Sequence, residues 1–151
     1  TPSGSNEMNK SQGERLTFWN MFNDEIVAYG KPFNIRKATT DHWYDVAIGN
    51  SNCHLSITLV NSESFIGLEL YIDNNKDLFD ALYKYKDDIE TETDMIFDWQ
   101  RLDDKKASRV LYKMPGLNFD DHSNYHELMA EIITKIRAMR KVLKAYLTKI
   151  S

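Results

Sequence analysis

Ionisable and aromatic side chains recur between residues 42 and 72, where they could carry chemistry. Asp45 and Glu69 are carboxylates of the kind that hold hard divalent cations, and His54 could serve as a base or a ligand. Trp43 and Tyr71 add aromatic rings beside them. Whether these five side chains can act together depends on the elements that position them.

The same stretch contains three runs in which apolar and polar residues alternate, separated by polar breaks at residues 49–52 and 61–64. Such alternation predicts strands with one buried face, and tight polar breaks predict an antiparallel meander. One parity is apolar and predicts the core face: Tyr44, Val46, Ile48, Leu55, Ile57, Leu59, Ile66, Leu68, Leu70 and Ile72. The opposite parity carries all five side chains named above, so we predict a recognition surface on the other face of the sheet.

A catalytic interpretation of that face is weaker. The element order helix–strand–strand–strand–helix–strand is also that of the PD-(D/E)xK nuclease core, whose third strand carries Glu-x-Lys. Here that strand reads Glu69-Leu70-Tyr71, and the second strand offers His54 but no acid. The alternative of a degenerate nuclease would place Mg²⁺ or Mn²⁺ between Asp45 and Glu69. The alternative without any chemistry is a sheet face whose polar groups form hydrogen bonds within the protein and have only a structural role. We expect no catalytic residue and no cofactor, because no nucleophile, glycine-rich loop or metal-spacing motif supports one.

A second candidate lies near the end of the chain, where residues 123–148 show helical spacing of apolar residues. Arg137, Arg140, Lys141 and Lys144 follow three- and four-residue steps on this helix, with no acidic residue after Glu131. Such a stripe can neutralise phosphates. Basic residues also favour helix C-termini through the helix dipole, and the sequence leaves both explanations open.

Further periodicity predicts helices over residues 12–29 and 76–92 and a hairpin of strands over residues 95–102 and 106–113, with a basic connector over 31–41. The predicted order is therefore α-β-β-β-α-β-β-α. We expect an α+β fold in which a five-stranded antiparallel sheet, a meander plus a hairpin, packs three helices on its apolar face.

The composition is that of one globular domain: 151 residues, 42% hydrophobic, 28% charged, net charge −4. We expect residues 1–11 to be a disordered linker or an expression remnant and residues 12–151 to be the domain. The first residue, Thr1, suggests a piece of a longer protein. No apolar run is long enough to span a membrane, so we expect no membrane contact. The single cysteine, Cys53, suits a cytoplasmic protein and is expected to be packed. His42, His122 and His126 show no spacing that pairs them with another ligand, and we expect His122 and His126 to be solvated or capping.

Several segments together resemble a bacterial and archaeal family, domain of unknown function family 4268. They are Phe18-Trp19-Asn20-Met21-Phe22-Asn23, His42-Trp43-Tyr44-Asp45, Ile48-Gly49, His54-Leu55-Ser56-Ile57-Thr58, Gly67-Leu68-Glu69-Leu70-Tyr71-Ile72, Leu78-Phe79-Asp80-Ala81-Leu82-Tyr83 and Lys106-Ala107-Ser108-Arg109. The resemblance implies a C-terminal domain, often behind a restriction-endonuclease-like domain. It implies no mechanism.

Together these observations predict a non-catalytic accessory domain of a nuclease-like protein. Its partners would be nucleic acid, an N-terminal nuclease-like domain of the same protein, or both. The alternatives are the metal-dependent nuclease described above and a dimerisation module that forms a homodimer.

Overall fold

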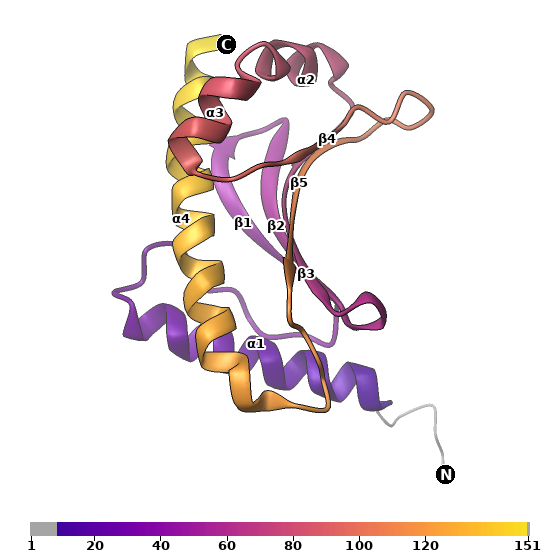
Figure 1. The fold of residues 1–151 in the computed structure, drawn as a ribbon, viewed down its shortest axis with the longest axis vertical. Helices are drawn as coiled ribbons and strands as arrows, with labels where there is room; N and C mark the ends of the chain where they lie inside the picture. Colours follow the sequence, from indigo (N-terminus) through magenta and orange to yellow (C-terminus); the bar gives the residue numbers. More distant parts are fainter. Residues whose placement is uncertain (1–8, 151) are drawn as a thin grey trace.

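A five-stranded antiparallel sheet forms the centre of the computed structural model, which describes residues 9–150 (Figure 1). Its strands lie in the order β1-β2-β3-β5-β4. Their bounds are β1 Trp43–Asn50, β2 Cys53–Val60, β3 Phe65–Ile72, β4 Asp98–Gln100 and β5 Ser108–Pro115. The α+β class, the meander and the hairpin are therefore confirmed. The hairpin joins the meander through β5, which pairs with β3 along its whole length.

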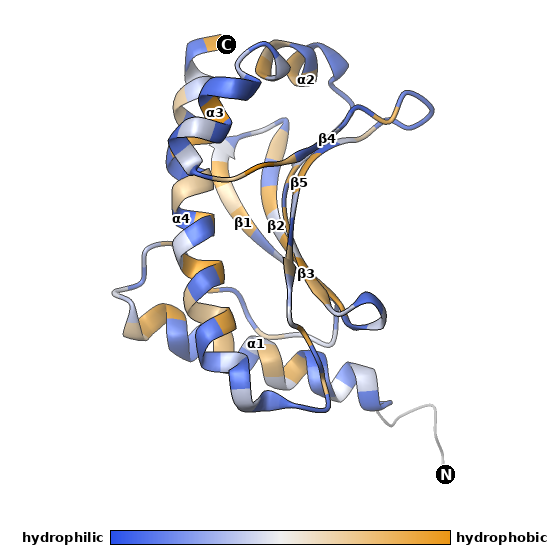
Figure 2. Ribbon diagram, in the orientation of Figure 1, coloured by the Kyte–Doolittle hydropathy of each residue, from blue (hydrophilic) through white to orange (hydrophobic). Residues whose placement is uncertain are grey.

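The apolar face of the sheet forms the core, as the alternation predicted. All ten residues of the predicted core parity are buried. Helices α1 (Lys10–Ala28) and α4 (Tyr125–Ile150) lie on this face, and α1 crosses beneath the first half of α4 (Figure 1). Figure 2 shows hydrophobic segments along β1, β2 and β3 and on both helices. Burying apolar side chains from the sheet and the helices on each other removes them from water and holds the layers together.

Helix α1 begins earlier than predicted because its first turn is capped. The Asn9 side chain accepts a hydrogen bond from the Gln12 amide, and the Gln12 side chain accepts one from the Asn9 amide. This reciprocal capping box satisfies two backbone donors that the helix leaves unpaired. Lys10 and Ser11, which we predicted to be linker, are therefore helical. Residues 1–8 of that predicted linker lie outside the described residues.

The prediction of three helices is wrong, because the segment predicted as one helix forms two. Helix α2 spans Lys76–Tyr83 and helix α3 spans Lys86–Thr93, so residues 9–150 contain four α-helices. No glycine or proline marks the break. At the break the Tyr85 ring packs 5.2 Å from the Tyr146 ring of α4, so packing against a distant helix ends α2. The residues predicted to be helical are therefore mostly helical, but they form two helices in place of one.

The first hairpin strand is also shorter than its apolar run predicted. We predicted residues 95–102, whereas β4 contains only Asp98–Gln100. The buried carboxylate of Glu90 accepts hydrogen bonds from the Phe97 amide at 2.8 Å and from the Trp99 indole at 3.2 Å. These bonds hold the incoming segment against α3, so pairing with β5 begins only after it.

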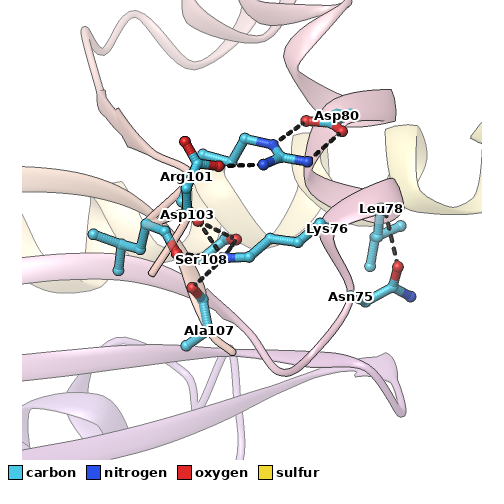
Figure 3. A network of polar contacts seen from close by, with 9 residues as sticks. Asn75, Lys76, Leu78, Asp80, Arg101, Asp103, Ala107 and Ser108 are labelled. Carbon is cyan, nitrogen blue, oxygen red and sulfur yellow. Dashed lines mark hydrogen bonds and ion pairs between the residues drawn. The ribbon is translucent and has the colours of Figure 1, made fainter. Parts of the chain in front are cut away.

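A lysine at the start of α2 anchors the loop between β4 and β5 (Figure 3). The Lys76 ammonium donates to the Leu102 and Ala107 carbonyls at 2.8 Å, to the Ser108 hydroxyl at 3.0 Å and to the Arg101 carbonyl. Charge-assisted bonds of this kind are stronger than neutral ones. The network fixes where β5 begins and, with it, the side chains that β5 presents to the open face. No helix in residues 9–150 is long and apolar enough to cross a membrane.

Candidate functional site

The face of the sheet opposite the helices contains a hollow of about 430 Å³. No α-helix of the described chain covers this face (Figure 1). We call the hollow the sheet pocket. It is lined by the five predicted residues, Trp43, Asp45, His54, Glu69 and Tyr71, and also by His42, Ser56, Thr58, Phe65 and Arg109. The structure therefore brings all five predicted side chains to one place.

The strand register arranges these side chains in rows that run across the sheet. Asp45 pairs with Ser56 on β2, and Ser56 pairs with Glu69 on β3, which gives a row of three hydrogen-bond acceptors. The neighbouring row contains His54, Tyr71 and Arg109. Directly opposite residues in antiparallel strands lie within side-chain contact, so each row is a continuous surface.

Charges in the pocket are paired loosely. The His54 Nε2 atom lies 3.5 Å from Asp45 Oδ1, and the Arg109 Nε atom lies 3.3 Å from Glu69 Oε2. The Glu69 side chain is 8% exposed. Burial raises the pKa of Glu69, Arg109 and His54 partly oppose that shift, and Asp45 adds to it. The surroundings of Glu69 therefore disfavour the ionised form of its carboxyl group.

Arg109 is a site residue that the strand periodicity did not single out. Its place depends on the pairing of β5 with β3, which sets Arg109 opposite Tyr71. Nothing in the spacing of the two predicted hairpin strands says which of them borders the meander. The alternation within residues 106–113 could have indicated its direction. Val110 is buried, so its neighbour Arg109 must point to the opposite, open face of the sheet.

The sheet pocket offers hydrogen-bond acceptors and aromatic rings with which it could bind a ligand. The His54 and Tyr71 rings lie 5.3 Å apart at an interplanar angle of 32°. Tyr71 stands at the position where the Glu-x-Lys motif of the nuclease core has its lysine, and its ring neighbour is His54. Within residues 9–150, no group of three or more histidine, cysteine or acidic side chains has the geometry of a metal site.

The second predicted site is also assembled, on α4. Arg137, Arg140, Lys141 and Lys144, which we call the basic stripe, line a cleft of about 510 Å³ together with Pro32, Thr134 and Ala138. Arg140 donates a 3.0 Å hydrogen bond from Nε to the Ala47 carbonyl of β1. No ion pair links any member of the stripe to an acidic side chain in residues 9–150.

The flanking lysines of α4 differ from the stripe because each has a partner. Lys135 lies 3.9 Å from Glu131 and 5.0 Å from the centre of the Tyr112 ring. Lys149 lies 4.8 Å from the centre of the Tyr85 ring. The structure therefore separates four cations that have no acidic or aromatic partner in the described chain from two that have one.

The remaining predicted residues have structural surroundings. His122 and His126 each lie 2.7 Å from a carboxylate of α1, Glu14 and Glu25 respectively. His126 joins α4 to α1, and His122 joins the short 3-10 turn His122–Asn124 before α4 to the same helix. Cys53 is buried, and burial raises the pKa of its thiol to about 11. The prediction that Cys53 is packed is confirmed.

Comparison with known proteins identifies one family. A family model described as domain of unknown function (DUF4268) matches residues 14–147. No curated protein and no solved structure matches the chain.

Proposed function

This chain belongs to the family described as domain of unknown function (DUF4268), and we propose that it is a non-catalytic domain that binds nucleic acid through the basic stripe. The observation that carries the proposal is the set of four cations that share one helix face, line one cleft and have no acidic partner in the described chain. Cations left unpaired at a surface are available to phosphates, and neutralising phosphates supplies most of the affinity in nucleic-acid binding.

The geometry of the cleft suits a phosphate backbone. Arg137, Lys141 and Lys144 are exposed, and Thr134 adds a hydroxyl to the same cleft. Arg140 is half-buried and held by its bond to β1, so its guanidinium has a defined position. A positioned arginine beside exposed lysines supplies both a directional and an adaptable contact to phosphate oxygens.

The proposal extends to the context of the domain. We propose that it works as an accessory domain beside a nuclease-like domain of the same protein, in the cytoplasm. The support is the resemblance described above, whose implied neighbour acts on nucleic acid. A phosphate-binding domain would increase the local concentration of that substrate for its neighbour.

Fluorescence anisotropy with labelled single- and double-stranded oligonucleotides tests the proposal. The informative variant is the triple substitution Arg137→Gln, Lys141→Gln and Lys144→Gln. Its matched control is Lys84→Gln, Lys105→Gln and Lys106→Gln, which removes the same charge from three exposed lysines that also have no ion pair in the described chain. We expect the stripe variant to weaken binding by about tenfold or more and to reduce the slope of log affinity against log salt by about 2 to 3.

The control variant should retain affinity close to that of the wild type. Equal weakening by both triple variants would mean that binding follows net charge and not the stripe. Absence of wild-type binding at about 50 mM salt would refute the proposal, because electrostatic contacts are strongest there. Sedimentation of the wild type over a range of concentrations would then decide whether the domain is instead a dimerisation module.

A further inference from the structure

The side chains of the acceptor row in the sheet pocket accept no hydrogen bond from the described chain. The side chains of Asp45, Ser56 and Glu69 form no hydrogen bond with another described residue, and their only charged neighbours are His54 at 3.5 Å and Arg109 at 3.3 Å. Ser56 is 5% exposed and Glu69 is 6% exposed. Buried polar groups are normally hydrogen-bonded, and leaving one unpaired costs about 1–3 kcal/mol. Of this row, the Glu69 Oε2 atom is buried without a hydrogen-bond partner in the described chain, and the Asp45 side chain is 32% exposed beside it. A buried acceptor left open on the wall of a pocket points to a ligand that brings a donor.

Aromatic rings flank the acceptor row on both sides. Trp43 lies two residues before Asp45 on the same face of β1 and is 44% exposed. The paired rings of His54 and Tyr71 lie on the other side of the row. Residues two apart in a strand are separated by about 7 Å, so a planar group placed over the acceptors has a ring within reach at either edge.

A glycine lies behind the part of the pocket wall that Thr58 forms. Gly67 stands in the cross-strand row that begins with Trp43 and continues through Thr58. A Cβ atom on Gly67 would lie only 2.4 Å from the Thr58 hydroxyl oxygen. Glycine in a strand interior commonly marks a site where another group approaches the backbone closely. Here the approaching group is the Thr58 hydroxyl, so the glycine allows Thr58 to hold its place in the pocket wall beside Trp43.

Cations surround the pocket, while its floor carries carboxylates. A smaller hollow of about 220 Å³ shares Trp43 and Asp45 with the sheet pocket and contains Arg36 and Lys37. At the opposite side, the Lys113 ammonium lies 5.1 Å from the centre of the Phe65 ring, which lines the pocket. A surface built for a cationic side chain would repel its ligand with such a rim. Acceptors, aromatic rings and the Arg109 guanidinium line the pocket, and further cations lie at its edge. This combination matches a nucleotide, whose base carries donors and acceptors and whose phosphate is anionic.

We propose that the sheet pocket binds a single nucleobase of an unpaired nucleic-acid strand, with the adjoining phosphate at Arg36 and Lys37. The ligand must be unpaired because base pairing occupies the donors that the acceptor row would receive. Stacking of an unpaired base on an aromatic side chain contributes about 1–3 kcal/mol. This inference rests on the proposed nucleic-acid function but uses a different surface, and it makes the domain selective for single strands.

The acceptors also predict which bases bind. Cytosine and adenine carry an exocyclic amino group, guanine carries an amino group beside a ring N–H, and thymine and uracil carry only one ring N–H. Glu69 and Asp45 can accept from the amino groups, so we expect the three amino-bearing bases to bind about fivefold or more tightly than thymine, the lower end of what one specific pairing contributes.

Nuclear magnetic resonance with the four deoxynucleoside 5′-monophosphates tests this inference on the full chain. We expect amide signals of residues 43–45, 54–56 and 69–71 to shift on titration, with thymidine monophosphate the weakest ligand. Glu69→Gln, which keeps the size of the side chain, and Trp43→Leu should each weaken the shifts severalfold while the remaining spectrum stays that of the folded protein. The stripe triple variant should bind mononucleotides like the wild type.

The outcomes separate the two proposals. If the stripe triple variant keeps its affinity for oligonucleotides while mononucleotides shift the sheet-pocket signals, the basic-stripe proposal fails and the nucleobase inference stands. If mononucleotides at millimolar concentration leave those signals unmoved, or if all four shift them with equal affinity, the nucleobase inference fails. Shifts of the same signals by arginine ethyl ester at lower concentration than by any nucleotide would identify a surface for cationic protein side chains and would overturn it too.

Discussion

The sheet pocket and the basic stripe differ both in their side chains and in how the fold assembles them. The stripe lies on one helix, where spacing alone puts its four cations on one exposed face. The sheet pocket draws its side chains from four strands, and their positions depend on three strand pairings. The comparison shows that a charged surface on a helix is nearly independent of the fold, whereas a polar pocket on a sheet depends on it.

The energetic consequence follows from solvation. Charges on the stripe remain in contact with water, so their ionised forms are well solvated. In the sheet pocket the Glu69 carboxylate is buried, and its pKa is raised because water is excluded. Substitutions in the pocket should therefore change stability as well as ligand binding, whereas substitutions of exposed stripe residues should change binding with little effect on stability.

The largest expected effect is on the floor of the pocket. Gly67→Ala should lower the free energy of unfolding by about 2 kcal/mol, because the new Cβ would lie 2.4 Å from the Thr58 hydroxyl oxygen. Thr58 is branched at Cβ and cannot easily move that atom away. Urea denaturation monitored by circular dichroism measures the change.

Two double variants test whether the contact between Gly67 and Thr58 causes the loss of stability. Adding Thr58→Ala to Gly67→Ala should restore most of the lost stability, whereas Thr58→Val keeps an atom at the same position and should not. Equal stability of the two double variants would show that the contact is not the cause.

A smaller effect is expected where the basic stripe contacts the sheet. Arg140→Lys keeps the charge of the stripe but removes the Nε donor that binds the Ala47 carbonyl at the sheet edge. We expect a loss of about 1 kcal/mol in the free energy of unfolding. Lys144→Arg is the matched control, because its ammonium makes no hydrogen bond with another described residue. If both variants unfold at the same denaturant concentration, the bond to β1 contributes nothing.

The third prediction concerns pH. Burial raises the pKa of Glu69 above its ordinary value of 4.5, so the folded protein binds more protons than the unfolded chain above that pH. The contribution of Glu69 to stability is therefore present at low pH and falls as pH rises through the raised value. The difference in unfolding free energy between Glu69→Gln and the wild type should shift in favour of the variant from pH 4.5 upward.

The stripe triple variant provides the contrast for this measurement. Arginine and lysine stay protonated throughout that range, so the triple variant should retain the wild-type dependence of stability on pH. A difference between Glu69→Gln and the wild type that does not vary with pH would contradict the burial argument.

The smallest effect on stability is expected for the stripe itself. Lys141→Gln should change the free energy of unfolding by less than about 0.5 kcal/mol, because Lys141 is exposed and has no partner in the described chain. The same substitution should lower the salt slope of oligonucleotide binding by about 1. A destabilisation as large as that of Gly67→Ala would remove the contrast between the two regions.

Local periodicity determined much of this molecule. The alternation from Tyr44 to Ile72 was enough to identify the core face and, by exclusion, the face that carries Asp45 and Glu69. Helical spacing in the last segment was enough to place Arg137, Arg140, Lys141 and Lys144 together. Both patterns depend only on neighbours a few residues apart, which is why the sequence alone reveals them.

Contacts between distant residues decided the rest. The pairing of β5 with β3 brought Arg109 opposite Tyr71 and completed the sheet pocket. The packing of Tyr85 on Tyr146 ended α2 and began α3, although no residue between them breaks helices. These outcomes depend on how much apolar surface distant segments bury against each other. That area is set by the tertiary structure and cannot be calculated from neighbouring residues in the sequence.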